Sequence, residues 1–401
     1  MNNIIFSKDV TVIVTFFENI KKGKAMKIIG QGKTIITQED VWQNIKITDR
    51  IVTIASTVKV IDKEAFYNCE NLEEIIIPDS VEEIKDKAFM KCRSLKKFKF
   101  PENIKKISDL VLRSCDEIRE VIIPEGVKII GEMPFSYTKI KELKLPKSVE
   151  IISENAFSHC EYLEKIKISE NIMEISRGAF EYCSSLREVQ LHDEINKISP
   201  FAFYMCKNLQ EINLPKKIKK ICHSTFYHTG LKDIIIPESV EEIGTDCFYN
   251  CFSLKKIIIS DSVKHIRSRA FFGCDELTEI HLSNQIKTIV YETFYENIAL
   301  KTITLTENIK EIAKGAFQNC ENLEEMAFMG DIPKIYLKSF INCTKLSTFK
   351  IMNPKAKLQG LKKICDRYRI KFLKGYKDST VHKYAIKNNI QFIEIDDIDI
   401  F

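Results

Sequence analysis

The sequence lacks the motifs that mark most enzymes. It contains no phosphate loop, no G-x-S-x-G nucleophile turn and no H-E-x-x-H zinc motif. Its carboxylates and seven histidines are scattered over repeating positions that read as a solvated surface. We therefore predict that the protein is not an enzyme and binds no cofactor. An enzyme of this sequence would need its site within residues 355–401.

Neither sign of charge is in marked excess. The chain has 61 basic and 56 acidic residues, a net charge of +5, and the two signs are interleaved along 401 residues. A protein that tracks nucleic-acid phosphates usually carries a cluster of Lys and Arg. No such cluster is apparent, so we do not expect nucleic acid as a partner.

Long hydrophobic runs are missing as well. The longest apolar stretch near the start is Val10–Phe17, which contains two threonines and follows Asp9. It is too short to cross a bilayer. It also lacks the basic beginning and the small-residue cleavage site of a signal peptide. We expect no membrane span and no export signal in this chain.

What the sequence does contain is a repeat of about 23 residues. Phenylalanine recurs in steps of mostly 23 residues, with two steps of 22, and Leu112 fills the one gap in the series. Thirteen copies result, and their marker residues are Phe66, Phe89, Leu112, Phe135, Phe157, Phe180, Phe203, Phe226, Phe248, Phe271, Phe294, Phe317 and Phe340.

Each copy has the same order of apolar and turn residues, as the copy that begins at Leu72 shows. Ile75 and Ile77 alternate, as in a strand with one face inward. Pro78 has no N–H to donate and ends the strand. The segment Ala88–Cys92 is too short for a full helix and predicts a single helical or 3₁₀ turn. Stacked copies should pile the phenylalanines into a continuous interior column.

The thirteen cysteines follow the repeat and not the spacing of a metal site. No C-x₂-C pair exists, so we predict no metal site. A ladder of buried, reduced thiols is the expected arrangement. Oxidation between neighbouring copies stays open, because stacked cysteines could lie within disulfide reach. The ladder comprises Cys69, Cys92, Cys115, Cys160, Cys183, Cys206, Cys251, Cys274, Cys320 and Cys343.

Two copies are one residue shorter than the others, those that begin at Phe135 and Phe226. In both of them Thr takes the cysteine position, as Thr138 and Thr229. We expect a tighter turn in these copies, with the threonine hydroxyl bonded to the local backbone.

The pattern C-x-x-L-x-x-I-x-I-P-x-S-V-x-x-I-x-x-x-A-F, present from Cys69 to Phe89, resembles the BspA-type leucine-rich repeats of bacterial and protist surface proteins. The resemblance covers about residues 50–352. It implies an α/β leucine-rich-repeat solenoid with a parallel β-sheet on its concave face, short strands and single helical turns elsewhere, and caps at both ends. It also implies adhesion to host proteins or cells and a surface or secreted location. Without a signal peptide, a cytoplasmic location is the alternative.

The chain divides into three predicted segments. Residues 1–50 form a β-rich N-terminal cap, residues 51–352 the solenoid, and residues 353–401 a helix–strand cap. The run Met26–Gly32, MKIIGQG, resembles the N-terminal cap of bacterial members.

The C-terminal cap is expected to hold two helix–strand units. The first is a helix over Leu361–Tyr368 followed by a strand over Arg369–Leu373. The second is a helix over Val381–Asn389, with Ser379 as its N-cap, followed by a strand over Ile390–Ile395.

A partner site is expected on the concave face, where side chains between the inward positions point outward. Ile235 and Ile258, on adjacent strands, form an apolar patch with charged edges. The alternative is that isoleucine is simply a favoured strand residue. The outward side chains two residues earlier in each strand form a second row, which is largely acidic. Repulsion between Glu188 and Glu211 in this row favours a basic partner. The candidate residues are Ile235, Ile258, Asp233, Lys256, His281, Glu188 and Glu211.

The predicted function is therefore that of a monomeric, non-catalytic protein-interaction or adhesion module. The partner is a protein, and the resemblance implies a host or extracellular-matrix protein. An intracellular scaffold using the same surface is the alternative, and export of the native product would separate the two.

Overall fold

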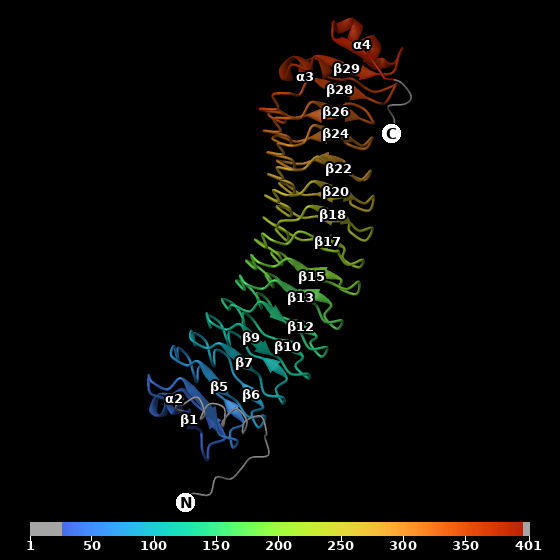
Figure 1. Ribbon diagram of the computed structural model, residues 1–401. Coiled ribbons are helices and arrows are strands. Elements are labelled where there is room, and N and C mark those ends of the chain that lie inside the picture. The colour runs from blue at the N-terminus through green and yellow to red at the C-terminus, as the bar shows by residue number, and fades with distance from the viewer. Residues whose placement is uncertain (1–25, 396–401) are drawn as a thin grey trace, which may run out of the picture. The chain divides into compact units, whose positions relative to one another are not determined.

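The computed structural model describes residues 26–395, which form a solenoid of stacked coils (Figure 1). By their internal contacts these residues fall into two units. Unit one holds residues 26–192 and 205–207, and unit two holds residues 193–204 and 208–395. The stretch Val10–Phe17, and with it the expected absence of an export signal, lies outside the described residues.

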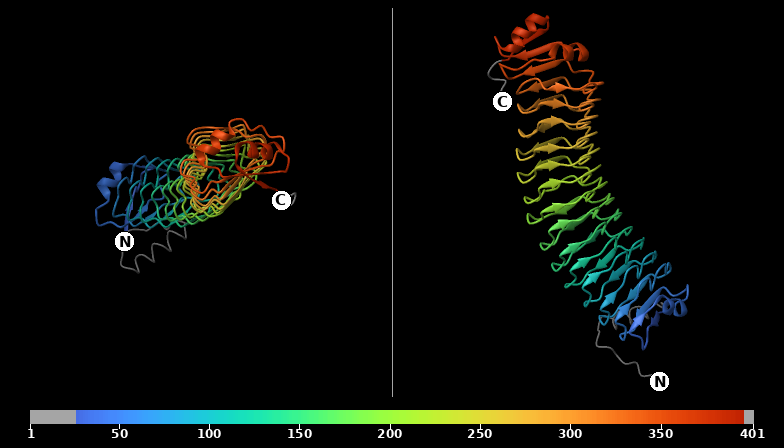
Figure 2. Two further views of the ribbon diagram at one scale, coloured as in Figure 1. Left: turned by 90° about the horizontal axis from the view of Figure 1, so that it is seen from above. Right: turned by 180° about the vertical axis from the view of Figure 1, so that it is seen from behind.

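Most coils contribute one strand to a first row, which we call the first-strand face. In unit one the row is β1 (Met26–Ile29), β3 (Ile51–Ile54), β5 (Glu74–Ile76), β7 (Lys97–Lys99), β9 (Glu120–Ile122), β11 (Glu142–Leu143), β13 (Lys165–Lys167) and β15 (Glu188–Gln190). In unit two it is β18 (Asp233–Ile236), β20 (Lys256–Ile259), β22 (Glu279–His281), β24 (Thr302–Leu305), β26 (Glu325–Phe328), β28 (Thr348–Ile351), β29 (Phe372–Gly375) and β30 (Gln391–Glu394). The pairings within each unit are parallel, which confirms the predicted sheet (Figure 2).

A second strand of only two residues follows the first in most coils. In unit one these strands are β2 (Ile35–Ile36), β4 (Val60–Ile61), β6 (Glu83–Ile84), β8 (Lys106–Ile107), β10 (Ile129–Ile130), β12 (Ile151–Ile152) and β14 (Glu174–Ile175). In unit two they are β16 (Lys197–Ile198), β17 (Lys220–Ile221), β19 (Glu242–Ile243), β21 (His265–Ile266), β23 (Thr288–Ile289), β25 (Glu311–Ile312) and β27 (Lys334–Ile335). Proline separates the two rows in several coils, as where β18 ends next to Pro237.

The segment around each phenylalanine is not the single helical or 3₁₀ turn that we predicted. It is a succession of tight turns, in which Ala88 N–H donates to Lys85 and Cys92 N–H donates to Phe89. Lys87 and Lys91 take left-handed backbone conformations, which a helical turn does not allow. The N–H groups between these turns donate to the next coil instead, as Phe89 N–H does to Val111. Stacking of coils thus replaces helical hydrogen bonds.

The predicted phenylalanine column is confirmed within each unit. In unit two, Phe203, Phe226, Phe248, Phe271, Phe294, Phe317 and Phe340 stack with ring centroids 5.3–5.6 Å apart. In unit one, Leu112 separates the stacked pair Phe66–Phe89 from the stack that begins at Phe135. All of these rings are buried and form the centre of the core.

The cysteine ladder is also confirmed as a set of unbridged, mostly buried thiols. From Cys92 onward, each ladder thiol donates to a phenylalanine carbonyl of the preceding coil, at 2.9–3.2 Å. Burial raises the pKa of Cys160 to about 12. Cys69 and Cys343, at the two ends of the ladder, are only partly buried.

The two short copies behave as expected. The hydroxyl of Thr138 donates to the Phe135 carbonyl at 2.7 Å, and that of Thr229 donates to the Phe226 carbonyl at 3.0 Å. Each hydroxyl therefore closes its own turn, whereas a ladder cysteine bonds the preceding coil.

The N-terminal segment was expected to be β-rich, and its described part also contains a helix. Besides β1 and β2 it holds α2 (Gln38–Asn44), which begins after a capping box. Asp40 N–H donates to the Thr37 hydroxyl at 3.3 Å, and Thr37 N–H donates to the Asp40 carboxylate at 3.0 Å.

The C-terminal segment follows the predicted order of helix, strand, helix and strand. The two helices are α3 (Leu361–Tyr368) and α4 (Thr380–Asn388), and the strands are β29 and β30. Ser379 is the N-cap of α4, since its hydroxyl accepts the His382 N–H at 3.2 Å. β29 and β30 continue the first-strand face beyond β28.

Candidate functional site

Three neighbouring strands of unit two bring most of the predicted site residues together. In the register of β18, β20 and β22, Ile235 lies beside Ile258, and Ile258 lies beside His281. Two residues earlier, Asp233 lies beside Lys256 in the same way. The intervening isoleucines of β18 and β20 are buried and hold the three strands on the core. We call this area the β18–β22 patch.

The patch is less apolar than predicted, because only one of the two isoleucines is well exposed. Ile235 has 67% of its surface exposed, whereas Ile258 is half-buried. β18 is the first strand of its sheet, and residues 209–214 of the preceding coil form no strand. Ile258, in contrast, lies on the middle strand with neighbours on both sides, and it is therefore less exposed than we expected.

The charged row of the patch is organised by Glu279, which sequence analysis did not single out. Lys256 Nζ lies 2.6 Å from one Glu279 carboxylate oxygen, and His281 Nε2 lies 2.9 Å from the same oxygen. Hydrogen bonds from Lys256 and then His281 lower the pKa of Glu279. Glu279 therefore stays ionised and positions both side chains beside Ile258.

The predicted repulsion along the acidic row is relieved by lysines of the chain itself. Lys97 pairs with Glu120 at 2.7 Å, and Lys165 pairs with Glu188 at 3.3 Å. A hydrogen bond from Gln190, followed by that from Lys165, lowers the pKa of Glu188. A basic partner is therefore not needed to stabilise these carboxylates.

Glu188 and Glu211 belong to different units and do not form one described site. Glu188 lies on β15 of unit one. Glu211 lies in unit two, within residues 209–214, which form no strand, and it is exposed. Because Glu211 lies on no strand, no strand pairing places it beside Glu188, and the structure does not support a site formed by the two residues.

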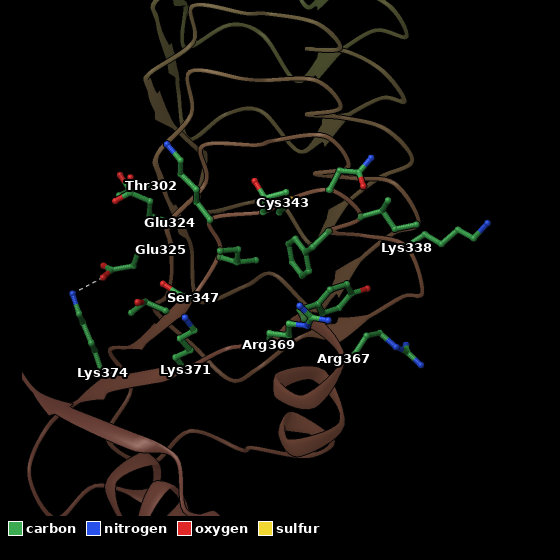
Figure 3. Close-up of a pocket in the computed structure, with 18 of the residues that line it drawn as sticks. Thr302, Glu324, Glu325, Lys338, Cys343, Ser347, Arg367, Arg369, Lys371 and Lys374 are labelled. Carbon is green, nitrogen blue, oxygen red and sulfur yellow. Dashed lines mark hydrogen bonds and ion pairs between the residues drawn. The ribbon is translucent and has the colours of Figure 1, made fainter.

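A second candidate site, missed from the sequence, lies next to α3 in unit two (Figure 3). It is a hollow of about 1380 Å³ between the last regular coil and the segment that follows α3. Arg367, at the end of α3, lines it together with Arg369, Lys371 and Lys374 of that segment. These four basic residues within eight positions are the signal in the sequence that could have indicated the site.

Neither area has the make-up of a metal centre or of a membrane-embedded element. Within residues 26–395, no three His, Cys, Asp or Glu side chains are grouped as metal ligands. None of the helices in this part of the chain is long and apolar enough to cross a bilayer. The arrangement offers contact surfaces and charged side chains for binding.

Comparison with known proteins places the repeat pattern in a defined group. The family model described as "BspA type Leucine rich repeat region (6 copies)" matches residues 35–163, 128–255 and 241–361. These overlapping matches extend from β2 to the first residue of α3. No curated protein matches the sequence.

Solved structures include similar chains from bacteria. A leucine-rich repeat protein from Bacteroides ovatus is 26% identical with a TM-score of 0.67, over 86% of this chain and 92% of the other. A leucine rich cell surface protein from Faecalibacterium prausnitzii is also 26% identical, over 80% of this chain and 83% of the other, with a TM-score of 0.38.

Proposed function

Because this chain belongs to the BspA-type leucine-rich repeat family, we propose that it is a non-catalytic protein-interaction or adhesion module that binds through the β18–β22 patch. The observation that carries the proposal is the exposed Ile235, set in one row with Ile258 and His281. An apolar centre with a charged edge is the usual composition of a protein-binding surface.

The charged edge of the patch has a fixed order of acidic and basic side chains across the three strands. Asp233 and Glu279 flank Lys256 in the outward row, and Lys256 is paired with Glu279. A partner that covers Ile235 gains apolar burial, and it must place a donor near Asp233. We infer a partner surface with an apolar side chain next to a basic residue, on a host or extracellular-matrix protein.

The alternative is an intracellular scaffold that uses the same patch. The family and the bacterial structures are compatible with either location. Fractionation of the source cells, with an antibody against the full chain, decides between them. Detection at the cell surface or in the medium supports adhesion, and detection only in the cytosol supports the scaffold.

The binding site itself is tested with Ile235→Thr/Ile258→Thr, which keeps β-branching on both strands. Binding to an immobilised panel of fibronectin, laminin and collagen is measured for the full chain and the variant. We expect the variant to bind at least about tenfold more weakly, as for loss of an apolar contact at the centre of an interface.

Ile122→Thr is the matched control, because Ile122 occupies the same position on β9 of unit one. Its binding should equal that of the parent. If the double variant folds normally and also binds as the parent does, the β18–β22 patch is not the site. Glu188→Gln and Glu211→Gln, each tested separately, would then be examined next.

A further inference from the structure

The hollow beside α3 exists because the regular stacking of coils stops there. In the preceding coil, Phe317 N–H donates to Ser339 and Asn319 N–H donates to Ile341. After Phe340 the next coil is replaced by α3, so the corresponding N–H groups of Phe340 and Asn342 find no backbone acceptor among residues 26–395. The N–H of Asn342, which lines the hollow, is therefore available to a ligand.

The walls of the hollow are strongly basic. Six cationic side chains line it against the two carboxylates Glu324 and Glu325. Lys374 is neutralised by Glu325 at 2.6 Å, the pair joined by a dashed line in Figure 3. The other five have no ion-pair partner within the described part of the chain: Lys338, Lys345, Arg367, Arg369 and Lys371. Cations grouped in this way attract an anionic ligand.

The hollow also has an apolar side. Leu337 lines it with 58% of its surface exposed. Tyr368 packs edge-on against Phe340, with ring centroids 5.1 Å apart, and closes the phenylalanine column. A large exposed leucine beside half-buried aromatic surface provides a contact for an apolar group of the ligand.

The spacing of the cations and the presence of Glu324 indicate which class of anionic ligand fits the hollow. The cations lie on separate segments around a wide hollow, so one phosphate or carboxylate would reach only a few of them. Glu324 in the wall would repel a uniformly charged chain such as a sulfated polysaccharide. A peptide can place an uncharged residue beside Glu324 and an apolar side chain on Leu337.

We propose that this hollow, which we call the α3 groove, binds an acidic peptide segment that also carries a large apolar side chain. The segment's carboxylates engage Arg369, Lys371 and their neighbours and accept from the free N–H of Asn342. The apolar side chain rests on Leu337. This site is separate from the β18–β22 patch and does not depend on it.

The test uses the full chain and a fluorescein-labelled synthetic peptide in which Glu alternates with Leu and Ser. Binding is followed by fluorescence anisotropy for the parent, for Arg369→Glu/Lys371→Glu and for Lys287→Glu/Lys314→Glu. The last variant makes the same charge change at two exposed lysines that do not line the groove. We expect at least about a tenfold loss for the first variant and less than about twofold for the second.

Two further peptides and a glycan test whether both the carboxylates and the apolar side chain of the ligand are needed for binding. Replacing Glu by Gln should abolish binding, and replacing Leu by Ser should weaken it. If the Leu-free peptide or a heparin oligosaccharide binds as tightly as the original peptide, the groove is a general polyanion site and the proposal is wrong. Equal losses in the two charge-reversal variants would also overturn it.

Cys343 gives a local readout that does not depend on any variant folding correctly. It is half-buried and lines the groove, whereas Cys69 holds the equivalent position at the other end of the thiol ladder. Bound peptide should slow alkylation of Cys343 in the parent protein and leave the rate at Cys69 unchanged. Binding without protection of Cys343 would place the peptide elsewhere and refute the proposal.

Discussion

Replacing Phe248 by alanine should strongly destabilise unit two. The ring is fully buried and lies between Phe226 and Phe271, with both centroid distances equal to 5.5 Å. A buried Phe covers at least roughly 150 Å² of apolar surface. At about 25 cal/mol per Å², its loss corresponds to about 4 kcal/mol.

Two opposing effects modify that figure. The alanine methyl retains part of the contact, whereas the cavity left by the ring adds to the loss. The cavity cannot close easily, because Phe248 N–H donates to Ala270 at 2.8 Å and Phe226 N–H donates to Cys247 at 2.9 Å. These bonds fix the spacing of the coils, so we expect about 3–5 kcal/mol.

Urea denaturation followed by circular dichroism measures the loss. Phe252→Ala is the control in the same copy, because that ring is 41% exposed and lies outside the column. It should cost less than about 1 kcal/mol. If Phe248→Ala also costs less than about 1 kcal/mol, the column does not hold the coils together and our account of the core is wrong.

Three further predictions concern the thiol ladder and an ion-paired carboxylate. Asn297→Cys should raise the free energy of unfolding by about 1 kcal/mol. Asn297 Nδ2 donates to the Phe271 carbonyl, as a ladder thiol would, but its Oδ1 is buried and has no partner in the described residues. Unchanged or lower stability of the variant in urea would contradict this prediction. In native alkylation followed by mass spectrometry, Cys343 should react well before Cys183, whose pKa burial raises well above its ordinary value, and fast labelling of Cys183 would refute the buried ladder. Hydrogen bonds from Lys96 and Arg50 lower the pKa of Glu73 from 4.5 to about 2, so its contribution to stability is present above pH 4.5 and is lost as the pH falls toward 2. Glu73→Gln should therefore flatten the acid loss of stability, and an unchanged acid profile in urea melts would exclude this role.

The features that could be predicted from the sequence are those fixed by local chemistry or by the period. The helix predicted over Leu361–Tyr368 has those same bounds, since Gly360 and Arg369 on either side take left-handed conformations. Ser379 was identifiable as an N-cap because its hydroxyl serves the next turn of the same segment. The phenylalanine column followed from the period alone, because any residue repeated every 23 positions must stack on itself in a solenoid.

The tight turns could not be predicted, because their left-handed positions are filled by ordinary residues. Lys87 and Lys91 carry no sequence signal for such a backbone, and the bonds that stabilise them come from the next coil. An outer aromatic column was missed for a related reason. Tyr204, Tyr227, Tyr249, Phe272 and Tyr295 stack at 4.4–4.8 Å, but most other copies hold non-aromatic residues at that position.

The candidate site was predicted in outline but not in its details. The register of Ile235, Ile258 and His281 follows from the period, and the structure confirms it. The exposure of Ile235 depends on the absence of a strand in residues 209–214, which no local pattern indicated. The α3 groove arises where a helix replaces a coil, which no repeat pattern indicated, although four of its six cations lie within residues 367–374.

The hydrogen bonds between coils have a mechanical consequence. The alternate N–H groups of the turns and the paired strands join each coil to its neighbours along the stacking direction. If the two ends of a unit are pulled apart, a terminal coil is held by one neighbour alone, and its bonds break one after another. Each released copy of about 23 residues adds roughly 75–80 Å of extended chain. A unit anchored at both ends would thus lengthen in regular steps under tension, and the coils that remain would keep their bound partners.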